Sequence, residues 1–145
     1  MSTKTKQLDL ELRTWGGKRK GAGRKPKAGR AGVSHGLRDA LASRHPVHVT
    51  LRVLAHVWNL RSRRCFTAIS AAFAGIRDRA DFRLVHFSVQ GNHIHLIIET
   101  QDERALSRGM QALMIRIAKQ LNRIMKRRGT VFGDRYHSHM LRTPS

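Results

Sequence analysis

A short polar break between two patterned segments is the feature that most constrains this fold. Apolar and polar side chains alternate from Phe82 to Val89, as they do along a strand with one face in a core. Residues 93–99 form a second apolar-rich segment of strand length. Between the two lie Gln90, Gly91 and Asn92, which are residues typical of turns. The pattern therefore predicts a β-hairpin.

Four further elements are predicted around this hairpin. Residues 48–54 alternate as a strand, and residues 63–79 repeat apolar side chains at helical spacing. Asp102 can cap a long amphipathic helix that ends before Gly129, and a last strand follows over residues 136–142. The order is strand, helix, strand, strand, helix, strand. It indicates an α+β fold of ferredoxin-like βαββαβ type, an antiparallel sheet with two helices on one face.

Strand alternation also predicts which side chains share a face of the sheet. The helix-covered face would hold Val47, Val49, Leu51 and Val53, then Val85, Phe87 and Val89, and finally Ile94, Leu96 and Ile98. The opposite face would hold His48, Thr50 and Arg52, then His86, Ser88 and Gln90, and finally His93, His95 and Glu99. The uncovered face is thus predicted to be polar and to carry histidine on all three strands.

The charge of the chain indicates a polyanionic partner. Lys and Arg total 29 against 9 Asp and Glu, a formal net charge of +20. Nucleic acid is the expected partner, because each neutralised phosphate releases condensed counterions. An anionic membrane surface is disfavoured, since no long apolar run accompanies the charge. The single cysteine, Cys65, excludes an intrachain disulfide, and the N-terminus lacks a secretory signal, so we expect a cytoplasmic protein.

Composition divides the chain near Pro46. Residues 1–44 form a basic tail rich in Gly, Lys and Arg, without apolar periodicity, and we expect it to be largely disordered; residues 45–145 form the folded domain. The tail either inserts cations into a narrow minor groove or acts as a solvated tether. The candidate DNA-binding residues are Lys18, Arg19, Lys20, Arg24 and Lys25 in the tail, and Arg116, Arg123, Arg127 and Arg135 in the domain.

Three side chains on the domain suggest phosphoryl-transfer chemistry. His93 and His95 project from the same side of a strand, about 7 Å apart along it, which suits two ligands of one divalent metal. The alternative is that they are half-exposed strand histidines without a ligand. Tyr136, the chain's one tyrosine, could attack a phosphodiester and store the bond as a phosphotyrosine. It could also be an ordinary aromatic that packs at the sheet edge.

Part of the chain resembles the HUH transposases, which are named for their His-hydrophobic-His motif. The resemblance lies in the segment VHFSVQGNHIHLIIE, in the long basic helix that follows it, and in the segment FGDRYHSHMLRTP. The branch most similar is that of the REP-associated tyrosine transposases, over residues 45–145. The resemblance implies a Mg²⁺ or Mn²⁺ ion held by the two histidines and a polar third ligand. It also implies binding of single-stranded or hairpin DNA, cleavage and rejoining through a phosphotyrosine, and a possible homodimer.

One departure from the family pattern bears on activity. The family's tyrosine lies on a helix after the final strand, for which this sequence has no matching position, whereas Tyr136 belongs to the preceding segment. We therefore expect a chain truncated before the catalytic helix. Three functions stay open: a metal-dependent DNA transposase or single-strand endonuclease, a non-catalytic DNA-binding remnant, and a basic RNA-binding protein. The predicted sheet face disfavours the last, because it shows histidines in place of stacking aromatics.

Overall fold

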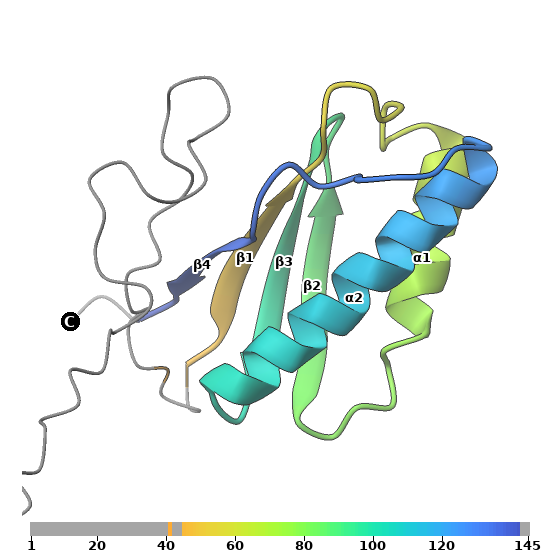
Figure 1. Cartoon of the computed structure of the whole chain (residues 1–145). Helices are drawn as coiled ribbons and strands as arrows, with labels where there is room; N and C mark the ends of the chain where they lie inside the picture. Colours follow the sequence, from red (N-terminus) through yellow and green to blue (C-terminus); the bar gives the residue numbers. More distant parts are fainter. Residues whose placement is uncertain (1–40, 42–44, 143–145) are drawn as a thin grey trace, which may run out of the picture. The chain divides into compact units, whose positions relative to one another are not determined.

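Six elements follow one another in the predicted order. The computed structural model describes residue 41 and residues 45–142 of the chain. The strands pair antiparallel in the order β2-β3-β1-β4, and both helices cover one face of the sheet, as the ferredoxin-like prediction required (Figure 1). The elements are β1 (Val47–Arg52), α1 (Arg63–Ala74), β2 (Phe82–Val89), β3 (His93–Thr100), α2 (Glu103–Ile124) and β4 (His137–Met140).

The hydrophobic core lies between the sheet and the two helices. On β3, Ile94, Leu96 and Ile98 have no exposed surface, and their partners on β1 are equally buried. The long helix contributes an apolar stripe at i, i+3 and i+4 spacing, which is the pattern that turns one side of a helix toward a core. Its fully buried members include Leu106, Met110, Leu113, Ile117 and Leu121.

Helix α2 crosses β2 at very close range. A Cβ atom placed on Gly109 would lie 2.0 Å from Cδ2 of Phe82, whose ring is itself buried. No real Cβ atom tolerates such a distance, so the glycine is required for the contact and not for backbone freedom. The absence of a side chain here sets how deeply α2 sits on the sheet.

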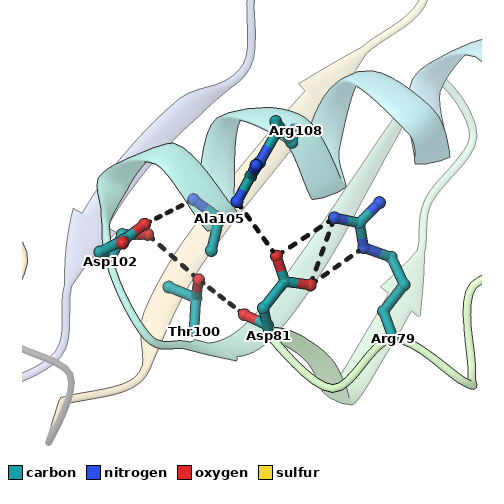
Figure 2. A network of polar contacts seen from close by, with 6 residues as sticks. All are labelled: Arg79, Asp81, Thr100, Asp102, Ala105 and Arg108. Atoms are coloured by element: carbon teal, nitrogen blue, oxygen red, sulfur yellow. Dashed lines mark hydrogen bonds and ion pairs between the residues drawn. The ribbon is translucent and has the colours of Figure 1, made fainter.

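The N-terminus of α2 is capped as the sequence predicts. The Asp102 carboxylate accepts a hydrogen bond of 2.7 Å from the Ala105 backbone N–H, one of the amides that a helix leaves unpaired (Figure 2). Just before it, the buried hydroxyl of Thr100 lies 3.2 Å from the carbonyl oxygens of both Asp81 and Asp102. The end of β3, the start of α2 and the segment before β2 are thereby joined.

The Asp81 carboxylate extends this network to two arginines. Nη2 of Arg79 lies 3.2 Å from one of its oxygens, and Nη2 of Arg108, on α2, lies 3.5 Å from the other (Figure 2). Both cations are partly exposed, so the ion pairs add modestly to stability. Their structural effect is to hold the turn after α1 against the first turns of α2.

Several predicted boundaries differ from the observed ones, and the end of α2 agrees. Helix α1 ends at Ala74, short of residue 79, because Gly75 starts a tighter turn in which the Ile76 N–H bonds to the Phe73 carbonyl. Ile76 lies after the helix but is still buried, so the apolar spacing in the sequence continues beyond the end of α1. Helix α2 ends at Ile124, before Gly129 as predicted, and Lys126, at φ 50°, takes the left-handed conformation that stops a helix. Strand β4 is shorter than predicted at both ends.

The predicted alternation along β2 is wrong at Val85. The register between β2 and β3 shifts after Leu84, so that Leu84 faces Ile98 while His86 faces Ile97. Val85 is therefore the extra residue of a β-bulge, and it is 47% exposed where alternation predicted burial. The two halves of β2 each alternate correctly, so that Phe82 before the bulge and Phe87 after it both face the core.

Candidate functional site

The uncovered face of the sheet carries the predicted histidine pair. Because Ile94, Leu96 and Ile98 of β3 point into the core, the alternating residues His93 and His95 point to the opposite face. Both side chains are half-buried. Their ring centroids lie 4.8 Å apart with the ring planes perpendicular. The structure thus brings the two imidazoles together.

Asn92 fixes the orientation of the His93 ring. Nδ1 of His93 lies 2.8 Å from the Oδ1 atom of Asn92. A carboxamide oxygen only accepts hydrogen bonds, so the ring donates from Nδ1 and leaves its Nε2 atom with a free lone pair. A metal-ligating histidine is held by this kind of partner on its other nitrogen.

Two residues of β1 contact the His95 ring at its Nδ1 atom. Nδ1 of His95 lies 3.1 Å from Nε2 of His48 and 3.3 Å from the Thr50 hydroxyl, and the rings of His48 and His95 stack with centroids 5.1 Å apart. Thr50 lies directly opposite His95 in the strand register. Both contacts are made to the same nitrogen of His95, and in the tautomer in which Nδ1 donates to His48 or Thr50 the Nε2 atom carries the lone pair for a ligand.

The histidine-bearing surface continues onto the two outer strands. On β4, His139 lies opposite His48 and His137 lies opposite Thr50, while on β2 Ser88 lies opposite His95. Residues directly opposite in antiparallel strands project from the same face. We call this surface the open face, and define it by His48, Thr50, His86, Ser88, His93, His95, His137 and His139.

Among residue 41 and residues 45–142, the pair does not belong to a three-ligand metal cluster, although His48 lies beside His95. Within residues 45–142 and at residue 41, no three His, Cys, Asp or Glu side chains gather closely enough to hold a metal ion. Glu99 shares the strand face with His93 and His95 but pairs with Arg83, with its Oε2 atom 3.2 Å from Nε. The two imidazoles fit a metal that takes its other ligands from solvent or substrate oxygens.

The structure does not bring Tyr136 to the histidine pair. Tyr136 is half-buried and packs against the hydrophobic core. The next residue, His137, lies on the open face. The Tyr136 ring therefore packs toward the helix-covered side of the sheet. A nucleophile would instead have to reach a phosphate on the side of the open face.

The predicted cationic residues fall into three places. Arg135 is exposed just before β4, and Arg127 is half-buried just after α2. Arg116 and Arg123 are exposed on α2, in the layer that covers the other face of the sheet from the histidines (Figure 1). The five predicted contacts of the tail lie outside the described residues: Lys18, Arg19, Lys20, Arg24 and Lys25.

The family model "Transposase IS200 like" matches residues 43–143, which include every element of the fold and the whole open face. The chain belongs to the IS200-like transposase family. None of the curated proteins matches it. Across the described part of this transposase-family chain, no helix is both long and apolar enough to cross a membrane.

Two solved structures share this transposase fold. A REP-associated tyrosine transposase bound to a REP hairpin is 16% identical with a TM-score of 0.56, over 77% of this chain and 64% of that one. A candidate transposase of Deinococcus radiodurans R1 is 13% identical with a TM-score of 0.55, over 75% of this chain and 85% of that one. The chain thus spans less than two thirds of the hairpin-bound structure's length.

Sequence reasoning placed the two histidines but missed the residues that hold them. Thr50 was assigned to the open face by alternation, and Asn92 was assigned only to a turn. The available signal was position, because an amide directly before His93 can reach its ring. No one-dimensional pattern pairs Thr50 with His95, since that contact depends on the register between β1 and β3.

Proposed function

We propose that this transposase-family chain binds single-stranded or hairpin DNA on its open face, with a Mn²⁺ or Mg²⁺ ion held by Nε2 of His93 and Nε2 of His95. The observation that carries the proposal is the shared arrangement of the two rings. Each has its Nδ1 atom in contact with a neighbour, and with His95 taken as the Nδ1–H tautomer both Nε2 atoms are left for a ligand on one face of the sheet. Imidazole ligands favour Mn²⁺ over Mg²⁺, so Mn²⁺ is the better probe.

The chemistry proposed for this face is DNA strand cleavage and rejoining. A bound divalent ion would polarise a phosphate oxygen and stabilise charge that develops during phosphoryl transfer. The strand and its neighbours hold the two imidazoles rigidly, because β3 is paired on both sides and buried on its other face. The exposed cation Arg135 precedes β4, where it can contact the DNA backbone. Such a reaction on DNA would take place in the cytoplasm.

Metal binding tests the first half of the proposal. Mn²⁺ titration followed by electron paramagnetic resonance should show one site in the native chain. We expect the affinity to fall at least about 100-fold in both His93→Ala and His95→Ala, because a two-histidine site cannot lose a ligand and persist. His86→Ala is the matched control, since His86 lies on the same face but outside the pair. Equal Mn²⁺ affinity in all four proteins would contradict the assignment of the metal site.

The identity of the nucleophile is tested separately. A labelled hairpin is incubated with the protein and Mn²⁺, and a denaturing gel is examined for a covalent protein–DNA adduct. We expect hairpin binding without an adduct, because Tyr136 packs on the core side of the sheet. An adduct that is lost in Tyr136→Phe would instead establish Tyr136 as the nucleophile and would require its ring to leave the core. Binding without cleavage identifies the chain as a DNA-binding member of the family.

A basic RNA-binding function is the second candidate, and only the charge favours it. The net charge of +20 suits RNA as well as DNA. The open face of the described strands presents imidazoles, whereas sheets that bind RNA through this topology stack bases on aromatic rings. Competition of the labelled hairpin by an unstructured RNA of equal length decides between the two.

A further inference from the structure

The C-terminal half of the described chain is cationic along an unusually long stretch. Between Glu103 and Asp134 the sequence contains no carboxylate side chain. Over the same stretch it contains Arg104, Arg108, Arg116, Lys119, Arg123, Lys126, Arg127 and Arg128. Most of this stretch is α2, so the charge is displayed by a rigid element and not by a loop.

Three of these cations share one exposed stripe of α2. Arg116, Lys119 and Arg123 are spaced i, i+3 and i+7, and all three are exposed. Within the described residues none of them forms a salt bridge, whereas Arg108 at the other end of the helix pairs with Asp81. The Arg123 guanidinium is oriented by a 2.7 Å hydrogen bond to Oε1 of Gln120. We call Arg116, Lys119 and Arg123 the helix stripe.

The helix stripe borders the seam between the two helices. A Cβ atom on Gly75, which caps α1, would lie 2.7 Å from Nη1 of Arg116, so this guanidinium rests against the end of α1. At the other end of α1, Arg64 donates a 3.3 Å hydrogen bond to the Ile124 carbonyl at the end of α2. Arg64 is exposed and adds a fourth cation beside the stripe.

The helix stripe and the open face lie on opposite sides of the sheet. The histidines point away from the helices, because they alternate with the buried residues of β3. The stripe is carried by α2, one of the helices that cover the other face of the sheet (Figure 1). The sheet and a helix about 10 Å thick separate them. A DNA segment bound at the histidines is therefore not in contact with the stripe, and the stripe is left for another polyanion.

We propose that the helix stripe is a second DNA-binding surface, which contacts the phosphate backbone of duplex DNA while the open face holds a different segment. The stripe spans roughly 10 Å along the helix axis, or about three base-pair steps of duplex. Its two guanidinium groups can each form paired hydrogen bonds to phosphate oxygens, and their regular spacing along a rigid helix suits the regular backbone of a duplex. The proposal rests on the proposed function only in taking DNA as the polyanion.

The first test measures how duplex binding depends on salt. Fluorescence anisotropy of a labelled 20-base-pair duplex of arbitrary sequence is recorded at several salt concentrations for the full chain and for R116Q/K119Q/R123Q. Glutamine keeps the helix propensity of the replaced residues while removing the charge. The slope of log K against log salt should become shallower by about 3, because each lost phosphate contact accounts for about 0.9.

The matched control removes the same charge elsewhere. R61Q/R77Q/R142Q alters three exposed arginines in three separate segments, and Arg77 lies toward the β2 edge, where it lines a cavity with Arg83 and Val85. We expect its slope to stay within about 1 of the native slope. Equal slopes in the two triple variants would overturn the proposal, because the effect would then follow net charge alone.

The second test asks whether the two surfaces bind at once. A donor-labelled hairpin and an acceptor-labelled duplex are mixed with the native chain, and energy transfer between them is measured. Transfer that is lost in R116Q/K119Q/R123Q supports the proposal, as does a duplex affinity unchanged in His95→Ala. Displacement of the duplex by one equivalent of hairpin would overturn it, as would tighter binding of an RNA duplex at the stripe. If the hairpin fails to bind while the stripe-dependent slope persists, the stripe stands and only the proposed function fails.

Discussion

The two faces of the sheet are built from the same strands and differ in what holds their side chains. On the covered face, residues such as Leu96 are fixed by close packing of carbon atoms, with no exposed surface. On the open face, His95 is fixed by two polar contacts to its Nδ1 atom. Packing on the covered face fixes the register of the strands, and this register in turn positions the side chains of the open face. A shift of one residue in register would bury the histidines and expose the core.

The largest expected effect contrasts two neighbouring residues of β3. Leu96→Ala should lower the free energy of unfolding by about 2–5 kcal/mol, because it removes a fully buried side chain and leaves a cavity. His95→Ala, one residue away, should lower it by less than about 1 kcal/mol, since its ring is only half-buried and lies on the open face, outside the hydrophobic core. Urea denaturation followed by circular dichroism measures both. A similar loss in the two variants would mean that the open face also contributes to the core.

A somewhat smaller loss is expected at Gly109, where α2 crosses β2. Gly109→Ala gains helix propensity but places a methyl group against the buried Phe82 ring, so we expect a net destabilisation of about 1–3 kcal/mol. The double variant Gly109→Ala with Phe82→Leu reduces the clash and should recover part of the loss. If Gly109→Ala proved as stable as the native chain, the helix would sit farther from the sheet than the structure shows.

The open face is tested through the residues that orient His95. Thr50→Val and His48→Ala each remove one partner of its Nδ1 atom. We expect the double variant to bind Mn²⁺ at least about tenfold more weakly, or about 1.4 kcal/mol, while its unfolding free energy changes little. The same titration of Thr50→Ser, which keeps the hydroxyl, should give nearly native affinity. Thr67→Val, at an exposed position of α1, is the control for the substitution itself.

Retention of Mn²⁺ affinity in the double variant would show that packing of β3 alone orients the ring. That result would leave the metal site in place and remove the role assigned to β1. It would also show that the burial of the neighbouring residues of β3 orients His95 without direct contacts to its ring.

The sequence predicted the covered face better than the open face, for a physical reason. Burial repeats with a fixed period, so Ile94, Leu96 and Ile98 could be assigned from one strand alone. The order of elements, the cap at Asp102 and the placement of His93 and His95 on one face followed from the same reasoning.

Contacts between strands could not be predicted in this way. The partners of His95 depend on the register of β1 against β3, and the β4 histidines join the open face only because β4 pairs with β1. The packing of Tyr136 against the core depends on the path of the chain before β4, where no periodic pattern exists. The end of α1 was misplaced because Ile76, in the turn that follows the helix, is buried at a position that continues the helical spacing.

The smallest expected effect tests the bulge in β2, where the alternation rule failed. Val85→Thr should change the free energy of unfolding by less than about 0.5 kcal/mol, because the side chain is 47% exposed and its hydroxyl stays in water. Val49→Thr is the matched control on β1. There the same substitution buries a hydroxyl at a position with no exposed surface and should cost about 1–3 kcal/mol. Equal losses at the two positions would place Val85 in the core and restore unbroken alternation along β2. If Val85→Thr leaves the free energy of unfolding unchanged while Val49→Thr lowers it, Val85 lies outside the core as the bulge requires. The bulge then allows His86 to face the open face while Phe82 and Phe87 both face the core.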